Sequence, residues 1–239
     1  MTEEFYRIWV YLSTEPLLGL TVTLVAYQAG MWVYSKGKLN PLLNPVLIAV
    51  VILVGLLMLT DTDYQTYFAG AKFVHFMLGP ATVALAVPLY SQFQKVKSTF
   101  PVILVSILFG SATAALSAIG IAWVMGASEQ TLLSLAPKSV TAPIAMGIAE
   151  AVGGVPSLTA VLVILTGIIG AVIGPGVLNL FRIKDWRARG VAGGTASHGI
   201  GTARALQVSE VAGAFASLAM GLNGLATAIL LPILLGWLF

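Results

Sequence analysis

The stretch GVAGGTASHGIGTARALQVSE, residues 190–210, decides how this chain folds. It lies between two long apolar segments, yet it contains five glycines together with a histidine, an arginine and a glutamate. Each glycine costs a helix up to ~1 kcal/mol relative to alanine, so the glycines between 193 and 201 predict an unwound segment. Unwound backbone at membrane depth is tolerated only where protein or a water-filled cavity satisfies its polar groups. The stretch therefore predicts a site for a solute.

The composition indicates an all-α integral membrane protein that crosses the lipid bilayer several times. Of the 239 residues, 58% are hydrophobic and 9% are charged, whereas soluble domains carry about 25% charged residues. The net charge of +3 comes from short basic clusters, which report orientation in a membrane rather than binding to nucleic acid. The chain has no cysteine, which excludes disulfides and thiolate metal sites. Its first residues lack a basic n-region and predict mature protein rather than a signal peptide.

Apolar runs long enough to span a bilayer alternate with runs that proline and glycine interrupt. Spans are expected at residues 17–34, 45–60, 100–125, 156–178 and 211–239, and an interfacial helix at 5–12. Residues 64–97 contain Gly79-Pro80 and Pro88, which predict two half-helices meeting near 78–80. Residues 132–151 are apolar but interrupted at Pro137-Lys138-Ser139.

The two halves of the chain resemble one another in the same order. Residues 17–30 resemble 132–147, residues 44–57 resemble 155–169, and GSATAAL from Gly110 resembles GLATAIL from Gly224. These similarities predict two structural repeats, residues 1–126 and 127–239, each with two spans, a broken region and one further span. Placing the basic residues at 36–38 and 182–189 on the same side favours inverted repeats. Inverted repeats with broken helices meeting near the membrane midplane are typical of secondary transporters.

Within residues 190–210, helical spacing places Ser197, Gly201 and Arg204 on one face and His198 and Thr202 on another. A helix that begins near Gly199 would direct free N–H groups and its positive dipole end towards the break. Together with the guanidinium group, this end suits a carboxylate or phosphate. The alternative is structural: the arginine pairs with Glu210 or reaches the interface, and the histidine is a hydrogen-bonded core residue.

The other two interruptions supply further candidates. Thr82, after the first break, offers a hydroxyl group, and Lys138 with Ser139 offers a cation and a hydroxyl group inside an apolar segment. The lysine could instead extend to the interface or pair with Glu150. The candidates for proton coupling are His198, Glu150 and Glu210. No motif for an enzyme occurs, and the two histidines give no metal signal, so neither enzymatic activity nor a metal or other cofactor is expected.

Three segments, LGPATVALAVPLY (78–90), LAPKSVTAPIAMGIAE (135–150) and GGTASHGIGTARALQVSEVAGAFASLAMGLNGLATA (193–228), closely resemble the LrgB/CidB family. The resemblance covers nearly the whole chain, and GTASHGIGTARA is its most specific part. The family includes antiholin-like bacterial proteins, which regulate murein hydrolase export beside a small LrgA/CidA membrane partner. It also includes plastid glycolate/glycerate translocators. It is grouped with the cation–proton antiporters and bile-acid symporters, which implies inverted repeats with crossing broken helices.

These patterns predict a secondary carrier of a small anion, coupled to H⁺ or Na⁺. The resemblance implies that the anion is a carboxylate such as glycolate, glycerate or pyruvate and that the membrane is the bacterial cytoplasmic membrane. The alternative is an antiholin-like regulator that acts through an LrgA/CidA-like partner. The sequence leaves open which carboxylate is carried, the coupling ion, the direction of transport, and whether the chain forms a homodimer. It also leaves open whether the broken regions cross the membrane or return to the same side.

Overall fold

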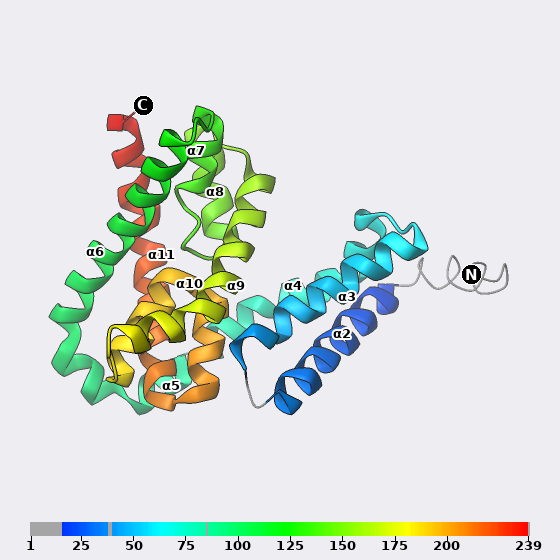
Figure 1. Ribbon diagram of the computed structural model, residues 1–239, viewed down its shortest axis with the longest axis horizontal. Coiled ribbons are helices and arrows are strands. Elements are labelled where there is room, and N and C mark those ends of the chain that lie inside the picture. The colour runs from blue at the N-terminus through cyan, green and yellow to red at the C-terminus, as the bar shows by residue number, and fades with distance from the viewer. Residues whose placement is uncertain (1–15, 38–39, 85, 239) are drawn as a thin grey trace. The chain divides into compact units, whose positions relative to one another are not determined.

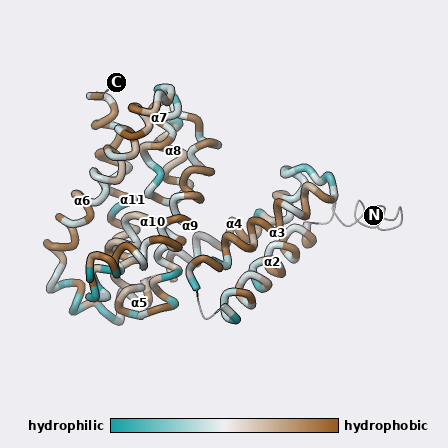
Figure 2. Tube along the Cα trace, in the orientation of Figure 1, coloured by the Kyte–Doolittle hydropathy of each residue, from teal (hydrophilic) through white to brown (hydrophobic). Residues whose placement is uncertain are grey.

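The computed structural model describes residues 16–37, 40–84 and 86–238, and these residues are helical with short connections. The interfacial helix expected at residues 5–12 lies outside them. Among the described residues, four helices are long and apolar enough to cross a membrane: α2 (Pro16–Lys36), α6 (Phe93–Val124), α9 (Pro156–Leu180) and α11 (Glu210–Leu238). They lie at four of the five predicted spans. The fifth, at residues 45–60, is an apolar helix of 16 residues and is shorter than these four. Figure 2 shows hydrophobic residues along the helices and hydrophilic residues near many of their ends. The chain is a multi-pass membrane protein, and it divides into two compact units at Ala84.

The first unit contains α2 (Pro16–Lys36), the 3₁₀ turn η1 (Pro41–Leu43), α3 (Pro45–Thr60) and α4 (Tyr64–Ala84) (Figure 1). Asn44 caps α3, because its side chain accepts hydrogen bonds from the next turn and Pro45 needs no donor at the first position. Helix α2 approaches α4 closely at Gly19, where a Cβ would stand 2.6 Å from the carbonyl oxygen of Tyr67. The hydroxyl groups of Thr23 and Tyr67 are 2.7 Å apart across the same contact.

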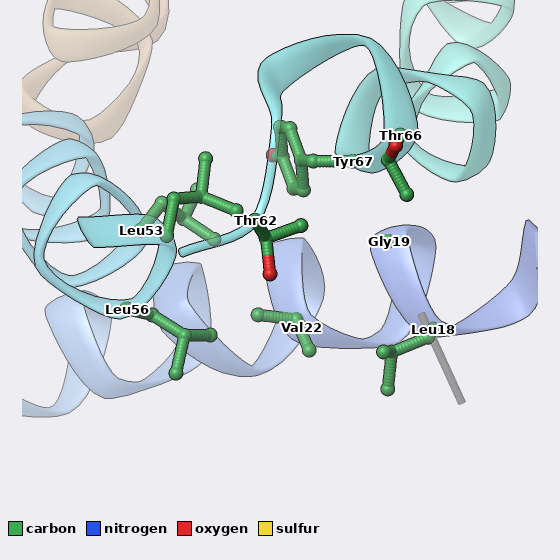
Figure 3. A pocket seen from close by; sticks show the side chains of 9 residues that line it. Leu18, Gly19, Val22, Leu53, Leu56, Thr62, Thr66 and Tyr67 are labelled. Atoms are coloured by element: carbon green, nitrogen blue, oxygen red, sulfur yellow. The ribbon is translucent and has the colours of Figure 1, made fainter. Parts of the chain in front are cut away.

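A small, partly open apolar cavity lies between α2, α3 and α4 among the described residues of the first unit, as Figure 3 shows. Its volume is about 20 Å³, and leucine, valine, threonine and Tyr67 side chains line it. A cavity of this size holds about one water molecule, so it is too small for an organic solute.

The first predicted break, near residues 78–80, is wrong, because helix α4 is continuous there. It runs through Gly79 and Pro80 to Ala84, and α5 (Ala86–Ser91) then includes Pro88. The chain is therefore not interrupted near residues 78–80. A proline is tolerated inside a membrane helix because local adjustment and neighbouring groups satisfy the carbonyl that it leaves without a donor.

The second unit contains α5, α6 (Phe93–Val124), α7 (Glu129–Leu135), α8 (Ala142–Val152), α9 (Pro156–Leu180), α10 (Trp186–Val208) and α11 (Glu210–Leu238). Helices α7 and α8 are short because the chain unwinds between them, at the predicted interruption around Lys138. Ser134 ties α7 to α9: its hydroxyl oxygen accepts a bond from Val155 N at 2.7 Å, and its carbonyl accepts one from Thr159 at 2.9 Å.

Helices α10 and α11 form the most extensive helix pair of this unit, and α6 packs against both (Figure 1). Gly190 and Gly194 of α10 lie directly against the backbone of Ala212 and Ala216 of α11. Small residues four apart on both helices allow this approach, as in other membrane helix pairs. One core cluster, which includes Ile103, Ile107 and Phe215, fills the space between α6, α10 and α11.

The matched stretches of the two halves differ in one respect. Residues 17–30 lie in the continuous helix α2, whereas residues 132–147 are divided between α7, an unwound segment and α8. The division into repeats 1–126 and 127–239, and their inversion, stay predictions.

Candidate functional site

Helix α10 is broken at a single residue, His198, within the stretch where the sequence predicts unwinding. His198 has φ 41° and ψ −131°, which lie outside the helical region, and helical geometry resumes after it. Such a backbone costs a non-glycine residue about 1–3 kcal/mol and persists only where surrounding structure holds it. The break is shorter than predicted, because Gly193 and Gly194 remain helical. Gly194 is required for contact with α11 rather than for unwinding.

The imidazole of His198 holds the break against α9. Its Nε2 lies 2.9 Å from the carbonyl oxygen of Val163, and the ring packs on Gly167, where a Cβ would stand 2.7 Å from the ring. The hydroxyl group of Thr202 donates to the His198 carbonyl at 2.8 Å, which satisfies an acceptor that the break exposes. His198 and Thr202 are both buried. These contacts match the structural role that the sequence leaves open for the histidine.

The two halves of α10 fold towards each other at the break. A Cβ on Gly201 would stand 2.5 Å from the carbonyl oxygen of Gly193 and 2.6 Å from Cβ of Ser197. On α9, Gly170 has no side chain where Ser197 Oγ lies, and a Cβ there would overlap that oxygen. Glycine at these positions therefore makes space for the break and for the serine hydroxyl group.

A cavity of about 440 Å³ lies beside the break, between α9, α10 and the start of α11. Ser197, which precedes the break, lines it together with Gly201 and Arg204, which follow the break. Gly193, Ala196 and Gly170 contribute small walls, and most of the remaining lining is aliphatic. His198, Gly199 and Thr202, which were also predicted to bind solute, do not line the cavity. The reason is that the change of backbone direction at the break points the side chains of His198 and Thr202 into the packed space between α9 and α11.

Two lining residues, Arg189 and Trp186, were missed as candidates. Arg189 Nη1 donates to Asn179 Oδ1 at 2.9 Å and to the carbonyl of Ile183 at 2.8 Å, and its guanidinium lies 5.3 Å from the Trp186 ring centre. In the sequence, this arginine belongs to the basic run at residues 182–189, which predicts only the orientation of the chain in the membrane. The run is also close in sequence to the break, and that proximity is the signal that could have identified it. The cavity thus has an arginine in each half of α10.

The unwound segment between α7 and α8 meets α10 near the break, through a residue that sequence reasoning did not identify. Asn223 of α11 donates from Nδ2 to the carbonyl oxygens of Ser139 and Thr195, each at 3.2 Å. Lys138 is half-buried, and its Nζ donates to Ser139 Oγ at 3.4 Å. Neither Lys138 nor Ser139 lines the 440 Å³ cavity. An asparagine inside an apolar span is itself a signal, because an unsatisfied polar group in hydrocarbon is costly.

The remaining predicted residues lie elsewhere. Glu150, in the last turn of α8, and Glu210, in the first turn of α11, are both exposed. The side chain of Thr82 lies outside the described residues. No cluster of three or more histidine, cysteine, aspartate or glutamate residues that could hold a metal occurs in the described part of the chain.

An ion pair between Asp185 and Arg187 stabilises the N-terminus of α10. Asp185 caps α10 by accepting from Arg187 N at 2.8 Å, and its carboxylate is 2.6 Å from the Arg187 guanidinium. Hydrogen bonds from the Arg187 side chain and backbone lower the pKa of Asp185 to about 2. Both side chains are about half exposed, so the pair contributes mainly by fixing the helix start.

The LrgB-like family matches residues 23–237. The protein YwbG of Bacillus subtilis is 39% identical over 93% of this chain and 98% of its own length. The holin-like protein CidB of Staphylococcus epidermidis is 32% identical, and the antiholin-like protein LrgB of Bacillus cereus is 33% identical, each over 92% of this chain and 96% of its own length. No solved structure matches. The chain belongs to the LrgB-like family.

Proposed function

We propose that this protein is a secondary carrier of small carboxylates, located in the bacterial cytoplasmic membrane and coupled to H⁺ or Na⁺. The observation that carries the proposal is the 440 Å³ cavity beside the His198 break, lined by Arg204, Arg189 and Ser197 with largely apolar walls. Its volume lies within the range of small-molecule sites, which are about 300–1,000 Å³.

The charge of the cavity favours an anion. No aspartate or glutamate lines it, whereas two guanidinium groups do. Placing a charge at membrane depth costs about 2.5–3.5 kcal/mol, so an arginine there is retained for a partner or a function. The second half of α10 also begins just after His198, and its N-terminal N–H groups carry partial positive charge. A bound carboxylate would accept from Arg204 and from the Ser197 hydroxyl group while its short carbon chain contacts the aliphatic wall.

The break supplies a means of moving the solute. Broken helices form the solute sites of many carriers, and one bundle of helices moves against the other around that site. Alternating access would then expose the cavity first to one side of the membrane and then to the other. Non-enzymatic action and solute transfer without a metal or cofactor form part of this proposal.

The test is uptake of labelled glycolate, glycerate and pyruvate into proteoliposomes, together with a thermal-shift screen of the purified protein against the same compounds. Arg204→Ala should abolish uptake and the thermal shift, because it removes the charge that neutralises the carboxylate. Lys184→Ala is the matched control, since it removes an exposed cation that does not line the cavity. Unchanged uptake by the Arg204 variant would exclude this site.

A second function is favoured by the names of the relatives. The proteins of about one-third identity are called holin-like or antiholin-like, and these names support an antiholin-like regulator more directly than they support a carrier. Such a regulator would act on murein hydrolase export with a small LrgA/CidA-like membrane partner. The two functions separate in one strain: a regulator keeps its effect on lysis when Arg204 is replaced by alanine, whereas a carrier loses uptake. Whether the chain forms a homodimer also stays a prediction.

A further inference from the structure

A second cavity, between α6 and α10, has a volume of about 560 Å³, and the proposed carrier site does not use it. Its wall on α6 is one face of that helix: Thr99, Val102, Ile103, Ser106, Gly110 and Ala114. Its wall on α10 comes from the half of that helix before the His198 break. Because the α6 residues are three and four positions apart, the cavity is a groove that follows the helix.

The groove has two different ends, because α6 and the first half of α10 run in the same direction. Thr99, near the start of α6, lines the groove together with Asp185 and Arg187 at the start of α10. Further along both helices, a Cβ at Gly110 would stand 3.3 Å from Cγ2 of Thr195. One end therefore carries a carboxylate and a guanidinium group, and the groove becomes apolar away from it.

The charged end of the groove lies at the membrane interface. The apolar helix α9 ends at Leu180, and the exposed aromatic side chains of Phe181 and Trp186 follow it. Aromatic residues next to a span sit at the level of the lipid headgroups. The groove thus begins at headgroup level and continues into the hydrocarbon region.

The same end is strongly basic. In residues 93–99 and 181–189, five exposed cations stand beside a single exposed acid, Asp185; the cations are Lys95, Lys97, Arg182, Lys184 and Arg187. Asp185 accepts from Nε and Nη2 of Arg187, and the N–H groups of Nη1 point elsewhere and can donate to a phosphate. The charge of this end therefore suits an anionic headgroup.

The apolar part of the groove has the length of one lipid chain. Val102 and Ala114 are about 18 Å apart along α6, at a rise of about 1.5 Å per residue. One leaflet occupies about 15 Å, half of the ~30 Å hydrocarbon core. Val191 and Phe215 add further apolar surface to this part of the groove.

We propose that the groove binds one anionic phospholipid, such as phosphatidylglycerol, with its phosphate at Arg187 and one acyl chain along α6. Basic residues beside a span attract anionic lipids, whereas a zwitterionic lipid of the same chain length gains little from them. Ala192 and Ala196 line this groove and also the arginine-lined cavity. The bound chain would therefore support the wall of α10 that the two cavities share.

The test uses the full chain purified in a mild detergent, without carboxylate, so its result is independent of the proposed carrier function. Phosphatidylglycerol or phosphatidylcholine with identical chains is added, and bound lipid is counted by native mass spectrometry while Tm is followed. One phosphatidylglycerol should be retained, and Tm should rise with saturation, because a ligand of the folded state stabilises it. Half-saturation should need at least about fivefold less phosphatidylglycerol than phosphatidylcholine, the effect of about one basic residue.

Two outcomes of this comparison overturn the proposal. Equal affinity for the two lipids would mean that the basic end does not recognise the headgroup. Glycerol phosphate carries the same phosphate without chains and should leave Tm unchanged. An equal rise with glycerol phosphate would assign the basic end to a free phosphate.

A variant in the apolar part locates the chain. Ala114→Phe fills the far end of the groove and should raise the half-saturating phosphatidylglycerol concentration at least about tenfold, as a blocked pocket does. Ala118→Phe is the matched control: it makes the same change one turn further along α6, at a residue that does not line the groove. Equal lipid affinity in the two variants excludes this groove. Loss of an oligomer in Ala114→Phe, with lipid affinity unchanged, would assign the groove to a second copy of the chain.

Two variants at the charged end should act with opposite signs. Lys97→Gln removes an exposed cation and should weaken phosphatidylglycerol binding by up to about fivefold while leaving phosphatidylcholine binding unchanged. Asp185→Asn removes the acid that competes for Arg187 and should strengthen phosphatidylglycerol binding. A merely structural effect on the fold would not change the preference between the two lipids. Weaker phosphatidylglycerol binding in Asp185→Asn, or an unchanged preference in Lys97→Gln, contradicts the proposal.

Discussion

Replacing Gly194 by alanine should destabilise the protein through its effect on the contact between α10 and α11. A Cβ at Gly194 would overlap the carbonyl oxygen of Ala216 and stand 2.9 Å from both its Cα and its carbonyl carbon. Ordinary contacts of a Cβ begin near 3.4 Å, and the obstructing atoms are backbone, so the helices must separate. Overpacking of this kind costs about 1–3 kcal/mol, which the better helix propensity of alanine offsets by up to ~1 kcal/mol.

The neighbouring residue provides the control. A Cβ at Gly193 would have the Gly201 carbonyl as its nearest neighbour, at 3.8 Å, which is an ordinary contact. Gly193→Ala should therefore keep or raise stability, since it gains the same helix propensity without the overlap. Both variants replace a glycine of α10 by alanine, so they differ only in the direction in which the added methyl group points.

The assay is thermal unfolding in detergent, followed by fluorescence-detected size exclusion. For a chain of this size, 1 kcal/mol corresponds to about 2–4 °C in Tm, so Gly194→Ala should lose several degrees and Gly193→Ala none. Adding Ala216→Gly should not restore the loss, because the overlapping atom is a backbone oxygen that glycine retains. Equal Tm values for the two single variants, or rescue by Ala216→Gly, would refute close backbone packing at this contact.

Three further predictions follow from the same structure. Asp185→Asn should lower the Tm at neutral pH. Because the pKa of Asp185 is depressed to about 2, its carboxylate stabilises the fold above about pH 4 and loses this effect as the pH falls through 2. A wild-type Tm that does not change between pH 5 and 2 would contradict this prediction. If His198 carries the coupling proton, His198→Gln should flatten the pH profile of uptake, whereas an unchanged profile would leave the histidine only its structural contact with Val163. Cysteines introduced at Lys36 and Lys184 of this cysteine-free chain should react with an impermeant reagent from one side of the membrane, and labelling from opposite sides would refute inverted repeats.

The arginine-bearing face shows the limit of helical spacing as a guide from sequence. Ser197, Gly201 and Arg204 line one cavity, but Ser197 precedes the break at His198 and the other two follow it, so an uninterrupted helical register does not explain their meeting. His198 and Thr202 do not line this cavity. Their environment depends on the direction in which α10 turns at the break, and that direction is set by contacts with α9 and α11 that lie far away in sequence.

The glycines show why the position of a helix break is hard to predict from sequence, even where a break is expected. Gly79-Pro80 predicted an interruption, yet α4 continues through it, and Gly193-Gly194 remains helical. A glycine either frees the backbone or admits a neighbouring helix, and composition does not distinguish the two uses. Gly194, Gly167 and Gly170 all serve the second use, because Ala216, His198 and Ser197 occupy the space beside them.

The sequence by itself determined that the chain is an all-helical membrane protein of a recognisable family, where most of its spans lie, and that residues 190–210 contain a break. These properties follow from hydropathy, periodicity and a specific motif, which are local. Only the tertiary structure decided that the break is confined to His198, that Arg189 and Arg204 share a cavity, and that Asn223 joins the two interruptions. The physical reason is that unsatisfied backbone groups in an apolar surrounding take their partners from other helices, and the identity of those partners depends on packing between residues far apart in the chain.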